Sequence, residues 1–251
     1  AVAALARSPV ARTSALAVAQ RSGDKDLVEV EEYFNTAGFE RWNKIYSESD
    51  EVNNVQLDIR TGHDQTIAKV LKWVDADGDA AKRTFCDAGC GVGSLAIPLA
   101  SRGANVSASD ISAAMAKEAA SRAKMVLPAN QARLARFSTS NLEDIKGKYD
   151  TVTCIDVMIH YPSDRMQDMV TSLASKANKR LIISFAPNTW FYSALKKVGE
   201  FFPGPSKTTR AYLHKEEDVT AALKEAGFTI KRKEFTGTNF YFSRLLEAVR
   251  E

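Results

Sequence analysis

A glycine-rich turn carries the clearest chemical signal in the sequence. The run from Asp87 to Gly93 reads Asp-Ala-Gly-Cys-Gly-Val-Gly and follows a short apolar stretch. Glycines let the backbone approach a ligand closely and adopt φ values that are closed to other residues. A helix that starts just after the turn offers free N–H groups to an anionic group. The turn therefore predicts a ligand in the crevice beyond the carboxyl ends of parallel strands.

The spacing of the glycines separates two kinds of ligand. A dinucleotide site needs Gly-x-Gly-x-x-Gly, whereas here Gly89 and Gly91 are followed by Ser94. An acid just before the glycine pair, Asp87, is the form found in methyltransferases. We therefore expect S-adenosylmethionine as the cofactor, with S-adenosylhomocysteine as its product. The predicted contacts in the turn are Asp87, Gly89, Cys90 and Gly91.

Residues that follow the next strands fit the same cofactor. A carboxylate at Asp110 can accept hydrogen bonds from both ribose hydroxyls. Ile111 and Met115 resemble the methyltransferase pattern in which two apolar side chains flank the adenine, and Asn141 offers an amide carbonyl to the adenine amino group. The predicted set is Asp110, Ile111, Met115, Asn141, Leu142 and Asp156. Taken singly, Asp110 and Asp156 could cap helices and Met115 could be core.

The elements that would position these residues alternate along the chain. Apolar runs predict strands at 84–88, 105–109, 134–138, 149–156 and 181–185, and helical periodicity predicts helices at 93–102, 112–125 and 164–177. Ser112 is the expected N-cap of the second of these helices. Strands that alternate with helices indicate a parallel, doubly wound sheet.

The C-terminal part departs from this alternation. A helix is predicted at 214–227, followed by strands at 229–234 and 239–249. The loop between these strands is too short for a crossover helix, so they must pair antiparallel. The predicted fold class is α/β: the Rossmann-like class I methyltransferase fold. It has a mostly parallel seven-stranded sheet, an antiparallel C-terminal hairpin, an N-terminal helical arm and an insertion after the fifth strand.

Three segments are predicted along the chain. Residues 1–22 contain Ala, Ser and three Arg but no acid, a composition that resembles the tail of an organelle transit peptide. The alternative is a disordered N-terminus carried over from protein expression. Residues 23–75 form the helical arm. Residues 76–251 form the cofactor-binding domain, with an aromatic insertion at 187–213 that we expect to cover the site together with the arm.

Charge and cysteine content limit the partners. The net charge of +3 equals the three arginines of residues 1–22, so the remaining chain is neutral, and no nucleic-acid partner is expected. Three cysteines suit a reducing compartment rather than a disulfide scaffold. Cys86 and Cys90 are four residues apart without a second pair of ligands, so no metal site is expected.

A longer pattern points to a substrate. Residues 32–46 read EYFNTAGFERWNKIY, residues 55–63 read VQLDIRTGH, and residues 159–162 read IHYP. From about residue 27 onward the sequence resembles the magnesium protoporphyrin IX methyltransferase family. This resemblance implies esterification of one propionate of magnesium protoporphyrin IX in chlorophyll biosynthesis, with magnesium present only as part of the substrate. It also implies a chloroplast location, peripheral to envelope and thylakoid membranes, and the magnesium chelatase large subunit as a partner.

The same resemblance implies roles for single residues. Tyr46 and His160 match the catalytic pair of the family. The porphyrin would contact aromatic and basic side chains, for which the predicted set is Phe39, Trp42, Arg60, Trp190 and Tyr192. His63 and His214 are expected to be surface or helix-packing histidines. Two alternatives stay open: a class I methyltransferase for another small molecule, and a porphyrin-binding regulator without catalysis.

Overall fold

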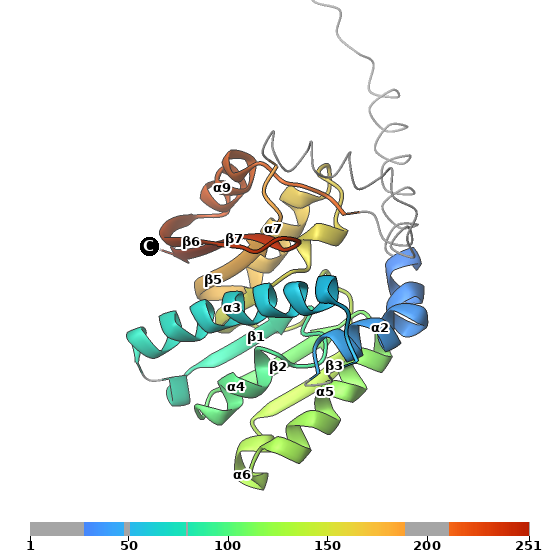
Figure 1. Cartoon of the computed structure of the whole chain (residues 1–251). Coiled ribbons are helices and arrows are strands. Elements are labelled where there is room, and N and C mark those ends of the chain that lie inside the picture. The colour runs from blue at the N-terminus through green and yellow to red at the C-terminus, as the bar shows by residue number, and fades with distance from the viewer. Residues whose placement is uncertain (1–27, 48–50, 79, 189–210, 251) are drawn as a thin grey trace, which may run out of the picture.

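A seven-stranded sheet forms the centre of the computed structural model (Figure 1), which describes residues 28–47, 51–78, 80–188 and 211–250. Its strands are β1 (Thr84–Ala88), β2 (Asn105–Asp110), β3 (Ala135–Thr139), β4 (Tyr149–Cys154), β5 (Ala177–Phe185), β6 (Phe228–Gly237) and β7 (Phe242–Arg250). Their order across the sheet is β3-β2-β1-β4-β5-β7-β6. The predicted residues Trp190 and Tyr192, and the predicted segment 1–22, lie outside the described residues.

Strand directions confirm the prediction of a mostly parallel sheet. Strands β3, β2, β1, β4 and β5 pair parallel, while β7 pairs antiparallel with both β5 and β6. Because β1 and β2 are parallel, their carboxyl ends meet at one edge, where the glycine turn and Asp110 both lie. The antiparallel hairpin β6–β7 brings the chain's C-terminal part to the same sheet.

Helices cover both faces of the sheet. They are α2 (Ala37–Ile45), α3 (Asn54–Asp77), α4 (Ala96–Ser101), α5 (Ala113–Val126), α6 (Ala129–Ala132), α7 (Met166–Lys176) and α9 (Glu216–Glu225), with 3₁₀ turns at Ala80–Lys82 and Met158–His160. Residues 28–35 are also helical. Figure 1 shows α7 and α9 beside β5 and β7, and α4 and α5 beside β2 and β3.

Alternating residues along the strands face two separate hydrophobic clusters. Leu181 and Ile183 of β5 pack in one cluster with α7 and α9, whereas Ile182 packs in the other with α3 and α4. Successive strand residues point to opposite faces, so a strand buried on both faces must be apolar throughout. This explains the continuous apolar run at 181–183.

The first long helix belongs to the sheet domain. Ile67, Val70 and Val74 of α3 pack in the same cluster as Phe85 of β1. The predicted boundary at residues 75 and 76 therefore does not separate two cores. Helix α3 also extends to Asp77, beyond the predicted end of the helical arm at residue 75.

Of two predicted helix starts, one differs from the structure for a local reason and the other is confirmed. Helix α4 begins at Ala96 rather than residue 93, because Gly91 and Gly93 have φ angles of 52° and 90° that no α-helix accommodates. The predicted N-cap of α5 is confirmed, since the Ser112 side chain accepts a hydrogen bond from the Met115 N–H. Among the described helices, none combines the length and the apolar content needed to cross a bilayer.

Candidate active site and cofactor cavity

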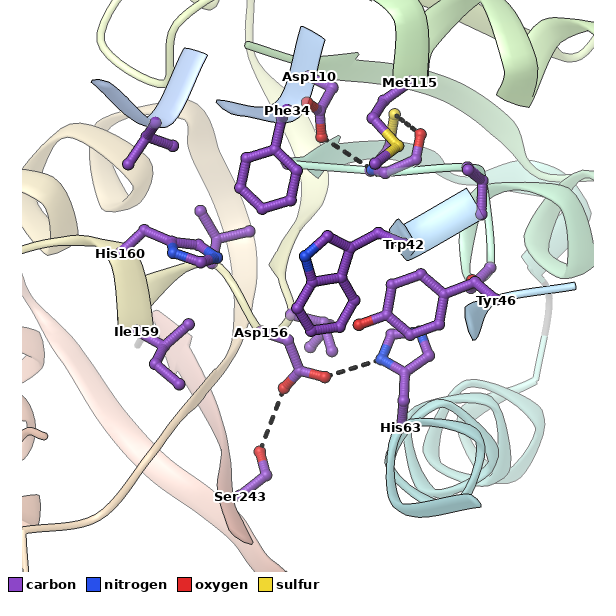
Figure 2. Close-up of a pocket in the computed structure, with 18 of the residues that line it drawn as sticks. Phe34, Trp42, Tyr46, His63, Asp110, Met115, Asp156, Ile159, His160 and Ser243 are labelled. Carbon is purple, nitrogen blue, oxygen red and sulfur yellow. Dashed lines mark hydrogen bonds and ion pairs between the residues drawn. The ribbon is translucent and has the colours of Figure 1, made fainter. Parts of the chain in front are cut away.

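One cavity of about 390 Å³ opens where β1, β2 and β4 end (Figure 2). Most of the residues predicted as catalytic or binding line it: Trp42, Tyr46, Asp87, Gly89, Cys90, Gly91, Asp110, Ile111, Met115, Leu142, Asp156 and His160. Phe39, Arg60 and Asn141 do not, although Ser140 and Leu142 on either side of Asn141 do. The cavity thus gathers residues from the N-terminal helices, the glycine turn and the end of β4.

The glycine turn is held against the end of β2 by its own N–H groups. Gly89 and Cys90 donate to the Ser109 carbonyl at 2.8 and 2.9 Å, and Gly91 donates to the Asp110 carboxylate at 2.9 Å. A Cβ atom on Gly89 would lie 2.2 Å from Val157, whereas one on Gly91 would meet nothing within 4 Å. Gly89 therefore permits close packing, and Gly91 leaves open space in the cavity wall.

Asp87 presents an unsatisfied carboxylate oxygen. Its side chain is 2% exposed, and Oδ1 accepts from the Thr153 hydroxyl at 2.8 Å, while Oδ2 has no partner among the described residues. Burial raises the pKa of Asp87 to about 6, because desolvation disfavours the ionised form. A cationic ligand group would supply the missing partner.

Asp110 fixes the turn and the next helix together. One carboxylate oxygen accepts from Gly91 N–H and the other from Ser112 N–H, both at 2.9 Å. Each oxygen keeps a further lone pair for a ligand hydroxyl. The open space at Gly91, the orphaned oxygen of Asp87 and the acceptors of Asp110 fit S-adenosylmethionine, which carries an amino group and two ribose hydroxyls.

Asp156 makes contacts other than those predicted. Its φ is 60°, and no other described non-glycine residue has a positive φ. Its carboxylate accepts from Ser184 at 2.9 Å and from Tyr241 at 2.8 Å, and it lies 2.7 Å from His63 Nδ1. Burial acts to raise the pKa of Asp156, but these partners outweigh it and hold that pKa below its ordinary value. The predicted cofactor ligand is thus directed toward His63 and β7.

Aromatic rings connect the two predicted catalytic residues. Ring centroids lie 5.2 Å apart for His160 and Phe34, 6.4 Å for Phe34 and Trp42, and 5.4 Å for Trp42 and Tyr46. Tyr46 then stacks on His63 at 4.4 Å. Figure 2 shows the Trp42 ring between His160 and Tyr46. Both predicted catalytic side chains therefore face the cavity without touching each other.

Burial keeps both of these side chains uncharged near neutral pH. Desolvation lowers the pKa of His160 to about 4, although nearby Asp156 acts to raise it. Desolvation also raises the pKa of Tyr46, and the charges of Asp156 and Asp64 add to that effect. His160 Nδ1 is buried and has no partner among the described residues.

Three predicted residues are placed outside the cavity wall. Arg60 donates to the carbonyls of Ile45 and Lys44 at 2.5 and 3.1 Å, so its guanidinium holds the end of α2 instead of facing the cavity. The Asn141 amide donates to Asp144 at 3.4 Å, which leaves its carbonyl available. Phe39 lies on α2 and is half-buried.

His63 is a site residue that the sequence prediction underrated. It is 6% exposed and lines the cavity, contrary to the expectation of a surface or helix-packing histidine. Its spacing carried a signal, since Ile59, His63 and Ile67 recur every four residues on one face of α3 and all line the cavity. His214, in contrast, is a packing histidine: it is buried, and its Nε2 bonds to the Met158 carbonyl at 2.9 Å.

The strand order, the glycine turn at the end of β1 and the aspartate at the end of β2 together define the class I methyltransferase fold. Consistent with this class, a family model described as a methyltransferase domain matches residues 85–179. A second model, described as the magnesium-protoporphyrin IX methyltransferase C-terminus, matches residues 154–250.

Similar proteins narrow the class to one family. Magnesium protoporphyrin IX methyltransferase, chloroplastic, from Arabidopsis thaliana is 56% identical, over 90% of this chain and 72% of its own length. Magnesium-protoporphyrin O-methyltransferase from Synechocystis is 53% identical, over 90% of this chain and 96% of its own length. A crystal structure of the Synechocystis PCC 6803 enzyme with bound SAH (S-adenosylhomocysteine) matches with a TM-score of 0.82 and 51% identity, over 88% of this chain and 98% of that one. The chain belongs to the magnesium protoporphyrin IX methyltransferase family, which confirms the resemblance.

Proposed function

We propose that this protein methylates a propionate carboxylate of magnesium protoporphyrin IX to give the monomethyl ester. The observation that carries the proposal is the cavity, where an aromatic wall adjoins a cradle suited to S-adenosylmethionine. When bound, that cofactor supplies a sulfonium methyl group whose C–S bond breaks as a C–O bond to the carboxylate forms, with the electron pair passing to sulfur and no proton released.

The proposed role of Tyr46 and His160 is to orient the carboxylate. A propionate has a pKa close to that of Glu, about 4 to 5, so it is ionised near neutral pH and needs no strong base. Neutral His160 and Tyr46 can each donate one hydrogen bond without bringing a competing charge. Alignment at near-attack distance in a dry site is then their main contribution.

The proposed cofactor contacts follow from the geometry of the turn. Asp87 Oδ2 would pair with the amino group, and Asp110 would accept from the ribose hydroxyls. Gly89, Cys90 and Gly91 provide the backbone surface. Ile111, Met115 and Leu142 line the adenine side, where the Asn141 carbonyl would meet the adenine amino group.

The structure revises the set of residues proposed to contact the porphyrin. Trp42 lines the cavity and remains a direct contact. Phe39 and Arg60 act indirectly in this proposal, since Arg60 holds the end of the helix that carries Trp42. Trp190 and Tyr192 lie outside the described residues and remain predicted porphyrin contacts.

Absorbance titration with magnesium protoporphyrin IX, paired with product analysis after adding S-adenosylmethionine, tests the proposal. We expect binding and a monomethyl ester. Binding without ester would instead support a porphyrin-binding regulator, and no binding would support a different small-molecule substrate. Tyr46→Phe and His160→Gln should each lower kcat while leaving S-adenosylhomocysteine affinity unchanged. An unchanged kcat in both variants would contradict the orientation role.

The cellular setting is also part of the proposal. A relative at 56% identity is named chloroplastic, which supports a chloroplast location for this chain. Within the chloroplast we place it at the envelope and thylakoid membranes as a peripheral protein, with residues 1–22 as the remnant of a transit peptide. We also propose the magnesium chelatase large subunit as its partner, because that enzyme makes the substrate. Co-purification from solubilised plastid membranes tests this part.

A further inference from the structure

The geometry points to His63 as a further substrate-positioning residue, whose Nε2–H donates a hydrogen bond to the propionate carboxylate while Asp156 holds the ring from the other side. This inference rests on the proposed function and deepens it. The proposed roles of the glycine turn and of the Tyr46 and His160 pair do not depend on this contact of His63. Its basis is a group of contacts at the end of β4 that cofactor binding leaves unexplained.

The first observation is an unsatisfied buried nitrogen. His63 is 6% exposed, and its Nδ1 lies 2.7 Å from Asp156. Its Nε2 is buried and has no hydrogen-bond partner among the described residues. A buried polar atom without a partner costs free energy, so such atoms commonly mark a site that a ligand completes. His63 lines the cavity, which offers that ligand position.

The second observation is the way in which Asp156 is fixed. Its φ of 60° is a strained conformation for a residue other than glycine, and strain of this kind persists where the surroundings enforce it. Here Tyr241 and Ser243, from the end of the chain, donate to the carboxylate with Ser184 of β5. A carboxylate held by three side chains fixes the orientation of the imidazole that pairs with it.

The third observation is the charge of the cavity wall. Among the described lining residues, the acids are Asp87, Asp110 and Asp156, and the basic side chains are Arg41, His63 and His160. An anionic propionate entering beside three carboxylates needs hydrogen-bond donors to offset their repulsion. His160 supplies a donor without a charge, because burial lowers its pKa to about 4.

His63 lies beside Tyr46, one of the two residues proposed to orient the carboxylate. Its ring lies 4.4 Å from that of Tyr46, and Figure 2 shows it directly beneath the Tyr46 ring, with Asp156 at its edge. Asp156 occupies the Nδ1 edge of the ring, so the Nε2 edge is the one left for the propionate.

This contact distinguishes substrate from product. The propionate is an anion before methyl transfer and a neutral ester afterwards. A hydrogen bond to an ionised acceptor is roughly twice as strong as one between neutral groups. His63 therefore binds the acid more tightly than the ester, which favours product release without any further step.

Two substitutions distinguish the contribution of His63 Nδ1 from that of His63 Nε2. In His63→Asn the side-chain amide replaces Nδ1 and can keep the Asp156 contact, but nothing replaces Nε2. In His63→Gln the amide reaches the Nε2 position and keeps a donor to the propionate. Each variant is titrated with magnesium protoporphyrin IX and with its dimethyl ester, which has the same macrocycle but no carboxylate. S-Adenosylhomocysteine affinity and melting temperature report on folding, and His214→Gln is the control for a buried histidine outside the cavity.

We expect wild type to bind the diacid about tenfold or more tightly than the dimethyl ester, in keeping with one charged hydrogen bond. His63→Asn should lose this preference and His63→Gln should keep part of it, while His214→Gln retains it. Equal loss of affinity for both porphyrins in His63→Asn, or an unchanged preference, would overturn the inference. Absence of porphyrin binding or ester formation by wild type would instead reject the proposed function.

Discussion

Asp87 links cofactor binding to pH through a single carboxylate. Its pKa of about 6 means that it is mostly protonated below that pH, when it cannot pair with the cofactor amino group. We expect S-adenosylhomocysteine to bind about tenfold more weakly at pH 5 than at pH 7, since each pH unit below the pKa costs up to a factor of ten. Isothermal titration calorimetry measures this directly.

The same pKa shift makes stability measured without cofactor fall as pH rises, whereas cofactor affinity increases. A carboxyl group whose folded pKa is raised destabilises the fold as pH increases from about 4 to about 6, because the unfolded chain ionises first. Asp87→Asn should therefore raise the melting temperature of the cofactor-free protein at pH 7 and remove the pH dependence of cofactor affinity. A wild-type pH dependence in that variant would show that another group is responsible.

At the scale of the element, the two glycines of the turn make a matched comparison. Gly89→Ala places a methyl group 2.2 Å from Val157 at a φ of 78°, whereas Gly91→Ala has open space at a φ of 52°. We expect Gly91→Ala to cost about 1 to 2 kcal/mol of stability from backbone strain alone. Gly89→Ala should cost more than that, because the clash adds to the strain. Urea denaturation of both variants checks the order, and equal costs would contradict the close packing.

The end of α2 depends on a side chain from another helix. Arg122 of α5 donates to the carbonyls of Tyr46 and Asn43 at 2.5 and 3.2 Å, and also pairs with Glu118 on its own helix. Arg122→Ala should lower kcat/KM about tenfold or more through misplacement of Tyr46, with cofactor affinity unchanged. Steady-state kinetics measure the loss.

The control for Arg122 is Glu118→Gln. It removes the charge partner but leaves the donors to α2 in place, so kcat/KM should stay near the wild-type value. A similar loss in both variants would assign the effect to α5 itself.

Local sequence predicted the elements well and their contacts less well. The strands, the N-cap at Ser112 and the antiparallel hairpin follow from periodicity and loop length, which act over a few residues. The partner of Arg60 could not be predicted in this way, because a long cation near a helix end can reach either a ligand or a carbonyl. Spacing placed His63 on the same helix face as two apolar residues, but its contact with Asp156 followed only from the packing of α3 beside β4 and β7. Contacts between distant segments depend on the register of the whole sheet, which spacing alone does not encode.

At the scale of the whole molecule, a buried charge cluster connects α3 to three strands. Arg180 of β5 pairs with Asp77 at 2.7 Å and with Glu247 of β7 at 3.3 Å, and Arg232 of β6 pairs with the same two acids. Glu247 has no exposed surface. Glu247→Gln should cost about 3 to 5 kcal/mol of unfolding free energy, because it removes one acid of a buried cluster and leaves Asp77 alone to balance the charges of Arg180 and Arg232.

An exposed ion pair provides the comparison for Glu247. Asp75 pairs with Arg102 at 2.6 Å, but its side chain is 53% exposed. Asp75→Asn should therefore cost less than about 1 kcal/mol. Denaturant unfolding of the two variants gives both values, and a similar small cost for each would mean that water reaches the Glu247 cluster.

The position of β7 has a consequence for how the chain folds during synthesis. This last strand of the described sequence inserts between β5 and β6, and the hairpin that ends in it provides Tyr241 and Ser243 to Asp156. A nascent chain synthesised as far as β6 thus has the β5 edge open, and an unpaired edge recruits other strands. Neither the sheet nor the wall of the cavity can close before translation reaches the final strand, so a chaperone that shields β5 during that interval would improve the yield of folded enzyme.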